Sequence, residues 1–109
     1  MTAVSKELLA EIKNDIDITW EDAAGDEKLS GCILRGMNRI NDLCGTQFDY
    51  STETGDSQAK DLLLNYVIYA RAGALDDFMK NYQADINALQ IAQEVKRYAQ
   101  QQAEESGTV

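Results

Sequence analysis

The chain has 109 residues, 44% hydrophobic and 27% charged, which are ordinary proportions for a soluble globular domain. Its 10 basic residues are scattered among 19 acidic ones, and the net charge of −9 argues against sequence-specific binding of nucleic-acid phosphates. Glu7 and Glu11 interrupt the apolar run that a signal peptide needs, so we expect a cytoplasmic protein. No apolar run reaches the roughly 20 residues of a transmembrane helix, so we expect no membrane partner.

The N-terminal region predicts a short helix followed by an extended connector. Ser5 is a suitable N-cap for a helix that ends near Asp15, with one narrow apolar stripe formed by Leu8, Leu9, Ile12 and Ile16. In the segment IDITW, residues 16–20, apolar side chains then alternate with polar ones, as they do in a short extended connector. Trp20 in this connector is either a core residue or a docking anchor for a partner.

The second predicted helix covers residues 26–44 and is clearly amphipathic. Its apolar residues recur at helical spacing, at Leu29, Ile33, Gly36, Met37, Ile40, Leu43 and Cys44. Gly45 is well suited to end the helix in a left-handed conformation. A polar loop over residues 46–57 follows, with Phe48 and Tyr50 as anchors and with Asp56 or Ser57 as the next helix cap.

A third, central helix is predicted over residues 58–80. Its segment LLLNYVIYARAGAL, residues 62–75, carries a single charge, Arg71, and points apolar side chains in nearly every direction. A helix that is apolar all round is a buried helix, covered either by its own chain or by other subunits. The sequence therefore predicts an all-α fold, a small bundle of three to four helices around a long, highly apolar central helix.

Arg71 is the first candidate interface residue, because burying its charge without a partner would be costly. Its stem could pack inside while its head reaches solvent or pairs with an acid of the same subunit. Alternatively, its head bonds an acidic side chain of a neighbouring subunit.

The C-terminal helix is predicted to have two separate apolar faces. Tyr82, Ile86 and Leu89 share one side, and the roughly opposite side holds Ala88, Ile91, Ala92, Val95, Tyr98 and Ala99. One face could contact the chain's own core and the other a neighbour, or a bend near Asn81 or Asn87 could turn both inward. Whether the helix is continuous through residues 81–84 stays open. We take Tyr82, Ile91, Val95 and Tyr98, with Arg71, as candidate interface residues.

We expect one domain over residues 1–99 and a polar tail over residues 100–109 that frays. Cys32 and Cys44 would lie about 18 Å apart on one helix, too far for a disulfide, so they are expected to be small buried hydrophobes. The chain contains no His, so no nucleophile has a histidine base beside it.

The acid-rich segment NDIDITWEDAAGDE, residues 14–27, departs from the calcium-loop pattern. Trp20 stands where that pattern needs a glycine, and Asp26 stands where it needs a bidentate glutamate. We therefore interpret the segment as a solvated acidic connector. The sequence predicts no enzyme, no cofactor and no metal site.

Several segments, in this order, resemble the head–tail connector (adaptor) proteins of long-tailed double-stranded-DNA phages and prophages. They are DIDITWEDAAGDEKL, ILRGMNRINDLCG, KDLLLNYVIYARAGALDDF and NYQADINALQ, and the resemblance covers residues 7–95. It implies a virion protein at the head–tail junction, made in the bacterial cytoplasm. Such a protein forms a ring of about twelve subunits under the portal protein, joining the DNA-filled capsid to the tail and offering a docking surface to neck or tail proteins. The resemblance supplies no catalytic residue and no cofactor.

The acidic composition fits a channel through which DNA passes without specific binding, because like charge repels phosphate. The alternative function is an acidic helical adaptor that binds a single protein partner as a monomer or dimer. Self-association on concentration would separate the two hypotheses.

Overall fold

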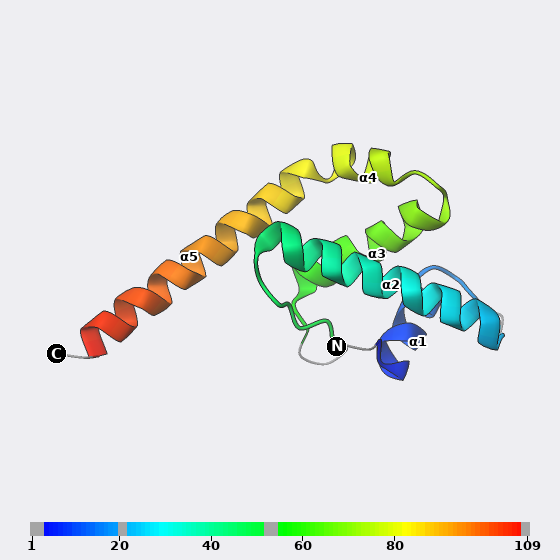
Figure 1. Cartoon of the computed structure of the whole chain (residues 1–109), viewed down its shortest axis with the longest axis horizontal. Coiled ribbons are helices and arrows are strands. Elements are labelled where there is room, and N and C mark those ends of the chain that lie inside the picture. Colours follow the sequence, from blue (N-terminus) through cyan, green and yellow to red (C-terminus); the bar gives the residue numbers. More distant parts are fainter. Residues whose placement is uncertain (1–3, 20–21, 52–54, 108–109) are drawn as a thin grey trace.

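The computed structural model describes residues 4–19, 22–51 and 55–107, with side chains through residue 102, and these residues form helices and no strand (Figure 1). Trp20 lies outside the described residues. The predicted all-α class is confirmed, but the described chain has five helices rather than three or four: α1 Lys6–Asp15, α2 Ala23–Cys44, α3 Ser57–Arg71, α4 Leu75–Asn81 and α5 Gln83–Gly107.

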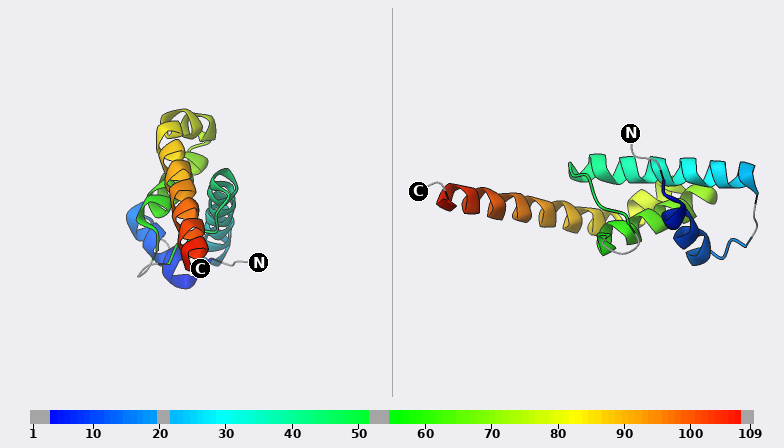
Figure 2. Two further views of the ribbon diagram at one scale, coloured as in Figure 1. Left: turned by 90° about the vertical axis from the view of Figure 1, so that its left-hand side faces the viewer. Right: turned by 90° about the horizontal axis from the view of Figure 1, so that it is seen from below.

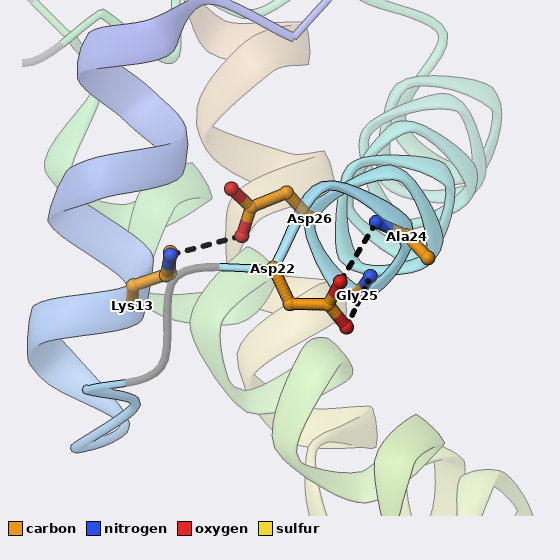
Figure 3. Close-up of polar contacts among 5 residues, drawn as sticks. All are labelled: Lys13, Asp22, Ala24, Gly25 and Asp26. Carbon is orange, nitrogen blue, oxygen red and sulfur yellow. Dashed lines mark hydrogen bonds and ion pairs between the residues drawn. The ribbon is translucent and has the colours of Figure 1, made fainter.

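Side-chain caps set the start of the first two helices. The Ser5 hydroxyl accepts the Leu8 N–H at 3.1 Å, which confirms the predicted N-cap of α1. The Asp22 carboxylate accepts the N–H groups of Ala24 and Gly25, both at 3.3 Å, so α2 begins before the predicted Asp26. Asp26 instead lies within the first turn of α2 and accepts an ion-pair hydrogen bond from Lys13 at 2.9 Å, which links α1 to α2 (Figure 3).

The prediction of a long, highly apolar central helix is wrong. Helix α3 ends at Arg71, and a turn follows in which Gly73 has φ of 69°, a left-handed conformation that glycine adopts without strain. The Ala74 N–H donates to the Tyr69 carbonyl at 2.8 Å and closes this turn. The sequence after it then forms the separate helix α4.

Aromatic packing explains why the chain turns back at this point. Phe78 of α4 is fully buried and meets Tyr66 of α3 edge to face, with ring centroids 5.6 Å apart. The Tyr69 ring lies 6.0 Å from Phe78 on the same side. The residues that would have extended the central helix therefore cover it instead, and Asp61, Ile68 and Arg71 are exposed on the remaining surface of α3.

The core lies chiefly between α2 and α3. Its buried residues on these helices recur at helical spacing, at Leu29, Cys32, Ile33, Met37, Ile40, Cys44, Ala59, Leu62, Leu63, Tyr66 and Val67. The two helices approach closely at Gly36, where a Cβ would lie 2.7 Å from the Tyr66 ring and 2.8 Å from the Leu63 side chain. A larger residue at this position would force the helices apart.

The loop after α2 is tied back to it by Asn41. The buried Tyr50 hydroxyl donates to the Asn41 side-chain carbonyl at 2.9 Å, and the Phe48 N–H donates to the same oxygen at 3.2 Å. Tyr50 is buried and Phe48 half-buried, so both predicted loop anchors are confirmed. Phe48 and Tyr50 together cover one flank of α2.

Helix α5 projects from the body of the subunit and gives the chain its elongated shape, 58 × 29 × 21 Å (Figures 1 and 2). At Tyr82 a bend separates α4 from α5, so the chain is not one continuous helix through residues 81–84. The helix continues to Gly107, and the fraying expected from Gln100 onward stays a prediction. The segment QQQAEES is rich in good helix formers and contains neither Gly nor Pro.

Candidate interaction surface

An apolar stripe runs along the outer face of α5. Ile91, Val95 and Tyr98 are 61%, 62% and 65% exposed, whereas Ile86 and Leu89 on the opposite face are each 2% exposed. The two predicted faces of this helix therefore exist. The bend lies at Tyr82, and it leaves the outer face uncovered rather than turning both faces inward.

The inner face of α5 shows where the helix leaves the body. Ile86 and Leu89 are in the core, and the side chain of the next residue, Gln90, donates to the Leu43 carbonyl of α2 at 2.8 Å. Gln93 is the last buried residue of α5, and each side chain from Glu94 to Gln102 is exposed. The α5 stripe, defined as Ile91, Val95 and Tyr98, thus begins beside the body and extends beyond it.

Tyr82 does not belong to this stripe. Its ring stacks on Phe78 with centroids 5.2 Å apart, and its hydroxyl donates to the Asn65 side-chain carbonyl at 3.0 Å. Partial burial raises the pKa of Tyr82, and the nearby Tyr69 and Asp85 add to the shift. The structure places this candidate interface residue in the packing of its own subunit.

Arg71 lies exposed at the C-terminal end of α3. It borders one hollow with Ile16, Asp17 and Ile68 and a second with Leu29 and Cys32. No ion pair involves it within the described part of the chain. Arg71 is thus exposed in the subunit, and its predicted bond to an acid of a neighbouring subunit stays a prediction.

Cys32 and Cys44 are buried and free, as the sequence predicted. Burial raises the pKa of both thiols, and the positive charges of Arg35 and Arg71 partly oppose the shift at Cys32. Among the described residues, no group of three or more His, Cys, Asp or Glu could hold a metal ion. No helix in the described ranges is both long and apolar enough to span a membrane.

A groove between α3 and α5 was not predicted from the sequence. It has a volume of about 350 Å³ and is lined by Gln58, Asp61, Leu62, Asn65, Tyr82, Asp85 and Ala88. These residues come from two helices and are brought together by the turn at residues 72–74 and the bend at Tyr82. No local pattern could have signalled the groove, because it depends on α4 folding back on α3.

Comparisons of the chain with protein-family models, with curated proteins and with solved structures gave no significant match. The α5 stripe and the α3–α5 groove are therefore the features of the subunit that bear on its function.

Proposed function

We propose that the chain is a structural subunit of a phage virion, a head–tail connector that forms a ring under the portal and joins the capsid to the tail. The α5 stripe is the observation that carries this proposal. In it, the chain binds no cofactor and catalyses no reaction. Its partners are copies of itself, the portal protein and downstream neck or tail proteins, with DNA passing through the ring.

The energetics of the α5 stripe support a role in assembly. Burying an Ile or Val side chain stabilises a protein by about 1.5–3 kcal/mol. Covering these three exposed side chains would therefore stabilise an assembly by several kcal/mol relative to the isolated subunit. Isolated exposed hydrophobics are common on protein surfaces, but a contiguous group on one helix face is characteristic of an interaction site. The stripe contributes little to the packing of its own subunit, since its side chains are largely exposed and lie opposite the buried face of α5.

The form of the subunit also suits a ring. A projecting helix reaches past its own body, so it can contact the neighbouring copy without the two bodies overlapping (Figure 1). A contact between different surfaces of two copies generates a closed ring when the rotation closes. The surplus of acidic residues favours a channel that does not hold DNA by its phosphates.

The runner-up function is an acidic adaptor that binds one protein partner. Ala88, Ile91, Val95 and Tyr98 follow one another at intervals of three, four and three residues, the spacing of a coiled-coil seam. A single partner helix could cover this seam in a monomeric or dimeric complex. The number of copies in the assembly distinguishes this adaptor from the connector.

The test is the molecular mass by light scattering across a concentration series, for the chain alone and mixed with the portal protein of the same phage or prophage. A discrete species of about twelve copies, alone or on the portal, is the expected result. A monomer or dimer that does not associate with the portal would contradict the connector proposal and favour the adaptor.

A further inference from the structure

The groove between α3 and α5 carries two acidic side chains at its edge. Asp61 and Asp85 are both exposed, and neither forms an ion pair within the described part of the chain. The Asp85 charge contributes to the raised pKa of Tyr82, which places this carboxylate close to the groove wall. The groove thus combines the negative charges of Asp61 and Asp85 with the apolar surface of Leu62 and Ala88, and Lys60, the neighbour of Asp61 on α3, is already paired with Glu11 at 2.8 Å.

This groove is continuous with the α5 stripe. Ala88 lines the groove, and Ile91 lies three residues further along the same face of α5. The nearest described cations on α5 are Lys96 and Arg97, which lie about 16 Å or more along the helix from Asp85. They are therefore too distant to neutralise the groove at physiological ionic strength, where exposed charges are screened within about 8 Å.

A basic row lies on α2, formed by Lys28, Arg35 and Arg39. At 100° per residue these three side chains lie within about 40° of one another and span about 16 Å along the helix. All three are exposed, and none forms an ion pair within the described residues. Arg35 and the exposed Arg71 both act on the Cys32 thiol, so a fourth positive charge lies beside the row.

The basic row is unusual for this chain. The protein has a net charge of −9, yet Lys28, Arg35, Arg39 and Arg71, none in an ion pair among the described residues, gather along one flank of α2 and the adjacent end of α3, with Asp17 and Asp42 as the acids beside them. The other flank of α2 is closed by Tyr50 and Phe48 through Asn41. Like charges placed side by side repel one another, and an acidic surface of a second molecule would relieve this repulsion.

We propose that the α3–α5 groove of one copy, together with the adjoining α5 stripe, binds the basic row on α2 of a second copy. This inference rests on the proposed function, because it names the contact through which copies assemble. Asp61 and Asp85 bond the guanidinium groups of the second copy, and the aliphatic stems of its Arg and Lys side chains cover Ala88 and Ile91.

The contact joins two different surfaces, so it propagates from copy to copy. An end-on view shows α2 on one side of α5 and α3 on the other (Figure 2, left panel). The groove uses the N-terminal half of α3, whereas Arg71 ends the same helix beside the basic row. Each copy thus offers its groove to one neighbour and its basic row to the next, which is the head-to-tail arrangement of a ring.

Charge reversal on each surface tests the contact. The groove variant carries Asp61→Lys with Asp85→Lys, and the row variant carries Arg35→Glu with Arg39→Glu. Each variant alone should self-associate about a hundredfold more weakly or worse than the wild type, measured by light scattering across a concentration series. The control is Asp76→Lys with Asp77→Lys, which makes the same charge change on exposed residues of α4 and should assemble like the wild type.

An equimolar mixture of the two variants is the decisive sample. In an alternating assembly, the lysine groove meets the glutamate row, and the unaltered groove of the row variant meets the unaltered row of the groove variant. Assembly should therefore return in the mixture. Two results would overturn this contact, provided that the wild type assembles: each variant alone also assembles, or the mixture stays dissociated. Either result would leave the proposed function standing.

A second measurement covers weak association. Zero-length carbodiimide coupling should join the Lys28 amine to the Asp61 or Asp85 carboxylate, and a mixture of isotopically light and heavy copies identifies links between molecules by mass spectrometry. A chain that stays monomeric at every concentration and shows no such link would overturn both this contact and self-assembly.

Discussion

Helices α2 and α5 both carry an apolar stripe along one face, yet only that of α2 is covered by the chain itself. Ile33 of α2 is fully buried against α3, whereas Ile91 of α5 is 61% exposed. The α2 stripe is explained by the stability of the subunit. The α5 stripe has no such explanation, so its apolar character points to a contact outside the subunit.

Replacing one isoleucine in each stripe by alanine should give the largest difference in the free energy of unfolding between the two helices. Ile33→Ala should lower the free energy of unfolding by about 2–5 kcal/mol, because it leaves a cavity between α2 and α3. Ile91→Ala should change it by less than about 0.5 kcal/mol, since its side chain is exposed. Urea denaturation measures both. A comparable loss in the two variants would mean that the α5 stripe stabilises the subunit.

A pair of glycines in α2 sharpens the account of its buried face. Gly36→Ala should destabilise the protein by about 1–3 kcal/mol, because the new methyl group would lie against the Tyr66 and Leu63 side chains. Gly31→Ala meets nothing closer than 3.5 Å and should stabilise α2 by about 0.5–1 kcal/mol through helix propensity. Thermal unfolding followed by circular dichroism should show shifts of opposite sign, and shifts of the same sign would place the α2–α3 contact elsewhere.

The smallest expected effect concerns the hydroxyl that closes one flank of α2. Tyr50 is buried and bonds Asn41, and burial raises its pKa well above the ordinary value of about 10. The folded state therefore holds this proton more tightly than the unfolded state. The contribution to stability is complete below about pH 10 and declines as the pH rises above that value.

Tyr50→Phe should therefore cost about 1 kcal/mol at pH 7 and make the alkaline decline in stability shallower than in the wild type. Urea denaturation between pH 7 and about pH 11 gives both quantities. Tyr98→Phe on the exposed α5 stripe is the matched control, which should leave the unfolding free energy at pH 7 unchanged. An equal alkaline decline in Tyr50→Phe and the wild type would show that this hydroxyl is not the group responsible.

Much of the fold could be predicted from periodicity and caps. Ser5 and Gly45 delimit helices as expected, and the two faces of α5 follow directly from the 3.6-residue repeat. Three of the candidate interface residues, Ile91, Val95 and Tyr98, form one exposed stripe. These features are local, since each depends on residues within a few turns of one another.

The features that the sequence missed depend on contacts between distant segments. The turn at residues 72–74 contains a glycine that a helix tolerates, and only the packing of Phe78 on Tyr66 and Tyr69 makes the chain fold back there. The same contact covers one side of α3, which ends at Arg71. It also draws Tyr82 into the subunit and creates the α3–α5 groove.

The double variant Ile91→Asp with Val95→Asp tests most directly whether the α5 stripe is an assembly surface. Its molecular mass and melting temperature are measured beside those of the wild type, with and without the portal protein. We predict that the multi-subunit species of the wild type is lost while the melting temperature of the monomeric subunit stays within a few degrees. An unfolded variant, or one that still assembles like the wild type, would contradict the claim that the α5 stripe is an assembly surface.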